Sequence, residues 1–172
     1  GFETSRPIKK VFAELSLSLE MHNRPKPFDP FYQVILPEKR VDIVGKESLL
    51  QRELTREFPG QADRIQTFYR AIRAQNDILS GVLDSGISMP PDGFMEKRAF
   101  KKLMMEQLPG PLADPLAGFA KGDAFRASVL APLMLGSRCQ TSPYSVAQLV
   151  RTVTHMSRGL YQIEGGIDAL KT

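Results

Sequence analysis

The feature of the sequence that most constrains the fold is a long apolar stripe between Gln61 and Leu79. Its residues recur every three or four positions, and charged side chains such as Arg64 and Asp77 occupy the opposite face. This spacing predicts an amphipathic helix over the whole segment, with one side buried against the rest of the fold. The stripe consists of Ile65, Phe68, Tyr69, Ile72 and Leu79.

Shorter segments repeat the same helical spacing. We expect helices over residues 7–17, 50–58 and 145–158, and a short helix that ends before Pro109. Pro59 and Gly60 should end the second of these, because proline lacks a backbone donor and restricts the residue before it. Residues 123–135 are so apolar that we expect them to be buried, with a kink at Pro132.

Two short β-rich runs, residues 32–36 and 41–44, flank the polar residues 37–40. This arrangement predicts an antiparallel hairpin. Because an isolated hairpin is marginally stable in water, we expect it to join a larger sheet. The predicted fold class is therefore α+β, mainly helical, with a small antiparallel sheet that contains the 32–44 hairpin.

Charge and cysteine content exclude several classes of protein. The net charge is +4, but Lys and Arg alternate with Asp and Glu along the polar stretches, so we expect no nucleic-acid partner. The single cysteine, Cys139, cannot form an internal disulfide and has no second ligand at metal spacing, so a small half-buried hydrophobe is expected there. A reducing cytoplasmic location fits, since no signal peptide or membrane-spanning run is present.

The motif search finds no catalytic constellation and no metal site. His22 and His155 are far apart in sequence, and we expect His155 to be a core or boundary residue of a helix. Ser128, Ser142 and Ser145 lie in no nucleophile turn. The sequence contains neither G-x-G-x-x-G nor G-x-x-x-x-G-K-[ST], so no phosphate-binding loop is expected.

Methionine is abundant in the helical part of the chain. Flexible methionine side chains suit irregular apolar pockets, but we expect most of them to be ordinary core, with a minority lining a cavity. The residues concerned are Met89, Met95, Met104, Met105, Met134 and Met156.

Several segments, taken in order, resemble the phytoene desaturase and carotenoid isomerase-like branch of the FAD-dependent oxidoreductases. A phenylalanine, Phe68, follows Phe58-Pro59 as one does in the family, whereas the proline that usually precedes the glycine pair in Tyr161 to Gly166 is missing. The matching segments are Val11 to Leu15, the hairpin Tyr32 to Ile43, Leu50 to Pro59, and Tyr161 to Leu170 with Gly165-Gly166.

The resemblance implies that residues 1–172 are a single substrate-binding domain fragment, inserted between two halves of an FAD-binding domain. Residues 1–45 would form the helix and hairpin, 46–160 a helical cap, and 161–172 the start of the return toward the flavin domain. We expect both ends of the sequence to be cut points within a longer chain. Gly165 and Gly166 would let the backbone pass close to the flavin, although a simple helix-initiating turn is an equal alternative.

For the parent protein the resemblance implies FAD-dependent oxidation of a small apolar substrate, polyene or isoprenoid-like, with no catalytic residue in this segment. The isolated segment is expected to be inactive, to bind no FAD, and to form a homo-oligomer through the open hairpin edge. Its partners would be the missing FAD-binding halves, and the parent could associate with a membrane surface. The alternative is a free-standing, non-catalytic α+β module that binds a hydrophobic ligand or protein partner.

Overall fold

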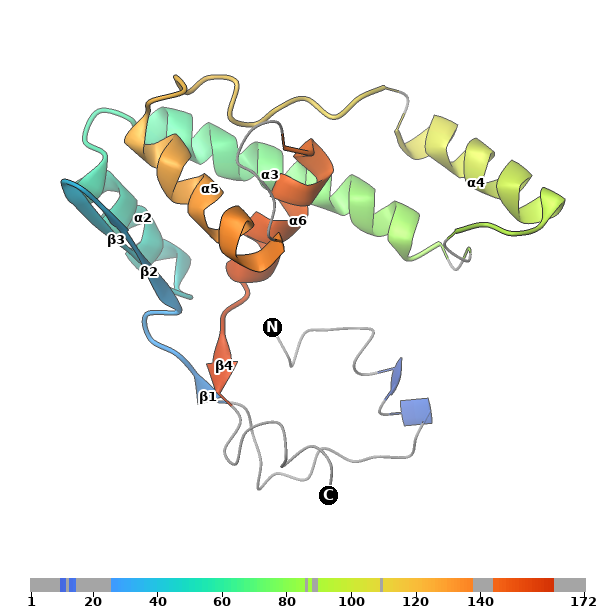
Figure 1. Cartoon of the computed structure of the whole chain (residues 1–172), viewed down its shortest axis with the longest axis horizontal. Helices are drawn as coiled ribbons and strands as arrows, with labels where there is room; N and C mark the ends of the chain where they lie inside the picture. The colour runs from blue at the N-terminus through green and yellow to red at the C-terminus, as the bar shows by residue number, and fades with distance from the viewer. Residues whose placement is uncertain are drawn as a thin grey trace. The chain divides into compact units, whose positions relative to one another are not determined.

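The computed structural model describes residues 10–11, 13–14, 26–85, 87, 90–108, 110–137 and 144–162 (Figure 1). They form the mainly helical α+β fold that the sequence predicts. The elements are β1 (Lys26–Pro27), β2 (Tyr32–Leu36), β3 (Lys39–Ile43), α2 (Glu47–Glu57), α3 (Ala62–Leu83), α4 (Phe94–Gln107), α5 (Ala124–Ser137), α6 (Val146–Met156) and β4 (Tyr161–Gln162).

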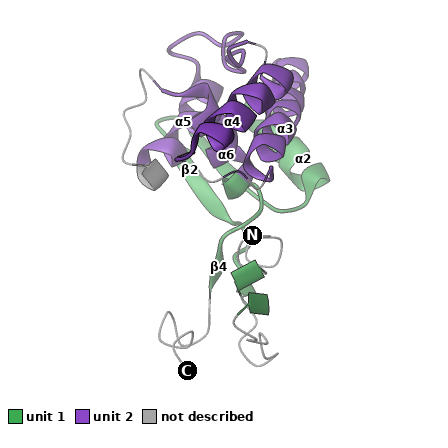
Figure 2. Cartoon of the chain, turned by 90° about the vertical axis from the view of Figure 1, so that its right-hand side faces the viewer, with its two compact units in different colours: residues 1–59, 155–172 green, residues 60–154 purple. Residues whose placement is uncertain are grey.

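The chain forms two compact units (Figure 2). Unit 1 contains residues Gly1–Pro59 and His155–Thr172, and unit 2 contains Gly60–Thr154. The two ends of the chain therefore belong to one unit, and the segment between them forms the other.

The hairpin of unit 1 is confirmed, with a tighter turn than expected. Leu36 pairs directly with Lys39, so only Pro37 and Glu38 lie in the turn. Lys39 is therefore the first residue of β3. Its Nζ donates a hydrogen bond to the carbonyl oxygen of Glu57 at 2.6 Å and lies 5.4 Å from the ring centroid of Phe58.

The expectation that the hairpin joins a larger sheet is wrong for the described residues, where β2 and β3 pair only with each other. Helix α2 packs on β3 in place of a third strand. Val34 and Val41 of the hairpin are buried together with Leu54 and Phe58 from α2 and its C-cap, so the helix supplies the apolar cover that an isolated hairpin lacks.

Within unit 1, β1 and β4 are antiparallel neighbours. Lys26 is opposite Gln162, Pro27 is opposite Tyr161, and the amide of Phe28 donates to the carbonyl oxygen of Leu160 at 2.9 Å. Residues 28–160 thus begin and end side by side.

Phe31 lies beside this junction, in the space left by two glycines. A Cβ atom at Gly45 would lie 2.5 Å from Cζ of Phe31, and one at Gly159 would lie 2.8 Å from the same atom. Gly159 also has a φ of +99°, which side chains disfavour. Both positions therefore require glycine while the Phe31 ring stays in place.

Unit 2 is built around an aromatic cluster. Phe68 of α3 meets Phe119 and Phe125 edge-on, with ring centroids 6.4 and 5.3 Å apart, and Phe119 lies 4.8 Å from Phe125. All three rings are buried. The stripe in α3 and the apolar residues 123–135 predicted this for Phe68 and Phe125, whereas Phe119 of the preceding loop was not predicted. Other fully buried side chains of this unit are Leu116, Leu133, Leu149 and Val150.

The remaining helices follow the sequence closely. Helix α2 ends before Pro59-Gly60, α3 continues four residues past Leu79, and α5 keeps Pro132 inside its bounds. Of the helix expected over residues 7–17, the structure describes Lys10, Val11, Ala13 and Glu14, all helical, and the rest lies outside the described residues.

Two tyrosines make the fold sensitive to alkaline pH. Burial raises the pKa of Tyr32 to about 12, and burial together with the neighbouring Asp114 carboxylate raises the pKa of Tyr144 to about 12. Because folding favours the neutral phenols, their contribution is complete below pH ~10 and is lost as the pH rises toward ~12.

We expect the free energy of unfolding to fall by about 2 kcal/mol for Tyr32 alone over this range. Absorbance of tyrosinate during an alkaline titration should show a late step that Tyr32→Phe reduces by about half and that Tyr32→Phe with Tyr144→Phe removes. A midpoint near the ordinary pKa for every tyrosine would contradict the burial of Tyr32.

Candidate ligand pocket in unit 2

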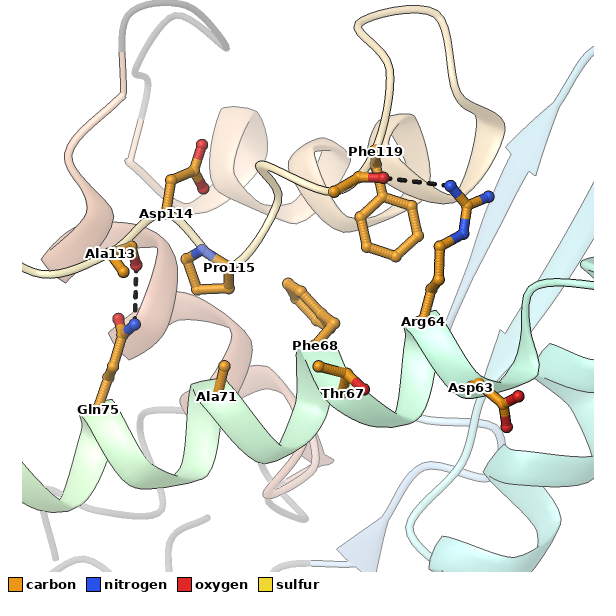
Figure 3. A pocket seen from close by; sticks show the side chains of 11 residues that line it. Asp63, Arg64, Thr67, Phe68, Ala71, Gln75, Ala113, Asp114, Pro115 and Phe119 are labelled. Carbon is orange, nitrogen blue, oxygen red and sulfur yellow. Dashed lines mark hydrogen bonds between the residues drawn. The ribbon is translucent and has the colours of Figure 1, made fainter.

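A pocket of about 390 Å³ lies between α3 and the loop that carries residues 113–119 (Figure 3). Arg64, Phe68, Ala71 and Gln75 recur along α3 at helical spacing, so they form one continuous wall. Pro115 and Phe119 of the loop face them. The lining is mainly apolar, and its volume falls at the lower end of the range for small-molecule sites.

Arg64 holds one end of the loop. Its Nη1 donates to the carbonyl oxygen of Gly118 at 3.1 Å, and its guanidinium carbon lies 5.2 Å from the ring centroid of Phe119. The Asp123 carboxylate is 4.0 Å from Nη2. The Arg64 guanidinium therefore positions the loop through a hydrogen bond and a contact with the Phe119 ring. The Asp123 carboxylate partly neutralises its charge.

Gln75 holds the other end. Its Nε2 donates to the carbonyl oxygen of Ala113 at 2.8 Å. Its Oε1 is buried and accepts no hydrogen bond within the described residues. A buried acceptor without a donor costs free energy, so this oxygen offsets part of the stabilisation that the Ala113 hydrogen bond provides.

A network behind the loop fixes Asp114. Its Oδ1 accepts from the amide of Leu116 at 2.9 Å, and its Oδ2 accepts from the Tyr144 hydroxyl at 2.7 Å. Arg126 donates to the Tyr144 oxygen at 3.2 Å and to the carbonyl oxygen of Leu116 at 2.9 Å. The Asp114 carboxylate thus braces the loop.

The arrangement can bind a small apolar group. Arg64 and Asp114, two of the three charged residues that line it, hold the loop. Among the described residues, no cluster of three or more His, Cys, Asp or Glu side chains could hold a metal ion. The pocket has the character of a binding site.

Gly165 and Gly166, the candidate flavin-adjacent residues, lie outside the described part of the chain, as do His22, Cys139, Ser142 and Met89. His155 was expected to be a core or boundary residue of a helix, and it is not in the core: it is exposed in the last turn of α6, between the half-buried Thr154 and Met156. Ser128 is buried and donates to the carbonyl oxygen of Phe125 at 2.7 Å, which is a structural role. Ser145 is exposed just before α6.

The expectation that most methionines belong to the core is wrong for the five that the structure describes. Met95, Met105 and Met134 are exposed, and Met104 and Met156 are half-buried. None of the five lines the pocket between α3 and the loop. Phenylalanine, leucine, isoleucine and valine fill the core in their place.

Sequence reasoning missed the pocket. It placed Arg64 on the polar face of the long helix and gave residues 111–119 no role. The available signal was the cluster of Pro111, Asp114, Pro115 and Gly118, which is typical of an ordered turn.

Within the described residues, none of the helices has both the length and the apolar character needed to cross a membrane.

Comparisons of the chain with protein-family models, with curated proteins and with solved structures each returned no match.

Proposed function

We propose that this chain is the substrate-side insert of an FAD-dependent oxidoreductase of the phytoene desaturase-like type. In this proposal the parent protein oxidises an apolar, polyene or isoprenoid-like substrate. The insert binds and orients that substrate and excludes water, while hydride transfer belongs to the flavin. The isolated segment has no activity of its own.

The pairing of β1 with β4 is the observation that carries the proposal. A domain inserted into another must leave its host and return at neighbouring points, and Pro27 and Tyr161 are direct antiparallel neighbours. The order of elements that resembles the flavoenzyme family places the return to the flavin immediately after Tyr161. The topology and the resemblance therefore favour the same arrangement.

The pocket in unit 2 favours the alternative function, a free-standing module that binds a hydrophobic ligand without catalysis. Its apolar wall suits a small apolar ligand. We rank this second because a binding module has no need for adjacent entry and exit strands. The two readings differ in one property, the requirement for flavin.

Flavin content separates the two functions. The protein expressed from the complete gene should be purified with FAD and should lose its flavin absorption band when an apolar polyene is added without oxygen. The 172-residue chain alone should bind no FAD in an equilibrium titration. A complete protein without flavin would contradict the proposal, and a yellow 172-residue chain would contradict the assignment of the cofactor to other segments.

Self-association and membrane contact remain predictions for the chain and its parent. Ile35 on β2 is 74% exposed and Phe28 beside β1 is 47% exposed, which gives unit 1 apolar surface that a second copy could cover.

A further inference from the structure

Helix α4 gathers its exposed apolar residues and its cations on one face. Phe94, Met95 and Met105 are 78%, 73% and 67% exposed. At about 100° per residue, these three and all four basic residues of the helix fall within one arc of about 160°. The basic residues are Lys97, Arg98, Lys101 and Lys102, and all four are exposed.

The opposite face of α4 is the one that meets the protein. Phe100, Leu103 and Met104 are half-buried there, and α4 packs on α3. The mixed face of cations and large apolar side chains is therefore left to solvent within unit 2, where Figure 2 shows α4 at the surface.

The acidic residues of α4 neutralise only one of the four cations of this face. Glu96 accepts from the amides of Asp92 at 3.0 Å and Gly93 at 3.5 Å, so it caps the start of the helix. Glu106 pairs with Lys102 at 3.8 Å. Within the described residues, Lys97, Arg98 and Lys101 have no carboxylate within ion-pair distance.

We propose that this face of α4 binds the surface of an anionic lipid bilayer. Exposed phenylalanine and methionine gain free energy by entering the boundary between headgroups and acyl chains, while Lys and Arg extend their stems to the lipid phosphates. An acidic protein would satisfy the cations alone, and a second copy would satisfy the apolar residues alone. An anionic bilayer satisfies both, and this binding requires no flavin.

Vesicle sedimentation tests the charge requirement. The 172-residue chain should sediment with vesicles of phosphatidylcholine containing 30% phosphatidylglycerol, and far less with pure phosphatidylcholine. Replacing Lys97, Arg98, Lys101 and Lys102 together by Gln should weaken binding by more than about a hundredfold, since each cation near an anionic surface contributes about fivefold. The matched control changes four exposed cations elsewhere to Gln, with the same loss of net charge, and should lose less than about tenfold. The control residues are Lys46, Arg52, Arg70 and Lys121.

A second pair of variants tests insertion. Phe94→Ser with Met95→Ser should weaken binding by about tenfold or more, whereas Ile35→Ser with Leu83→Ser, exposed at 74% and 54% on other elements, should not. Circular dichroism checks that each variant is folded. The proposal is overturned if the unchanged chain ignores anionic vesicles, if neutral vesicles bind it equally well, or if either control loses as much as its α4 counterpart.

Discussion

Replacement of Gly159 by alanine is expected to destabilise unit 1 by about 3 kcal/mol. The new Cβ would lie 2.8 and 2.9 Å from two atoms of the Phe31 ring, and alanine disfavours a φ of +99°. The ring must move for the side chain to fit, and it lies next to the paired strands β1 and β4. Thermal unfolding followed by circular dichroism measures the loss.

Alanine substitutions at two other glycines separate the effect of crowding Phe31 from the effect of a positive φ. Gly60 has a φ of +78° with nothing within 4 Å of an added Cβ, so Gly60→Ala should cost only about 1 kcal/mol for the backbone. Gly45→Ala crowds the same Phe31 ring without a positive φ. If Gly159→Ala lowers the free energy of unfolding no more than Gly60→Ala does, contact with Phe31 does not stabilise the pairing of β1 with β4.

The regular elements of this fold were predictable because their signals are local. The stripe from Ile65 to Leu79 alone determined α3, and the helix continues to Leu83 because Val82 adds one more buried position to the stripe. The two β-rich runs predicted the hairpin in the same way. Its cover by α2 could not be predicted, since one sequence does not show which segment packs on the apolar face of a hairpin.

The pocket depends on contacts between distant segments, which one sequence does not reveal. Gln75 and Ala113 are joined by a hydrogen bond across 38 positions of the chain, and Arg64 and Gly118 across 54. The side chains of Arg64 and Gln75 look like ordinary polar positions of an amphipathic helix. Only the folded loop shows that they line a cavity.

The basic face of α4 was hidden for a different reason. In the sequence, Glu96 and Glu106 stand among the cations, and the stretch reads as mixed charge. In the helix, the Glu96 carboxylate accepts a hydrogen bond from the Asp92 amide at the start of α4. The cations lie together on a different side of the helix. Charge alternation along a chain therefore does not exclude a cationic face once the helical period is applied.

Removal of residues 28–160 from the complete protein tests the central claim that they belong to a substrate-binding insert. Since Pro27 and Tyr161 are antiparallel neighbours, a two-residue Asn-Gly turn is long enough to join them. The measurement is the visible spectrum of the shortened protein before and after anaerobic addition of the apolar polyene. We predict that FAD remains bound and that the polyene no longer reduces it. Loss of the flavin, or reduction at the rate of the complete protein, would contradict the account.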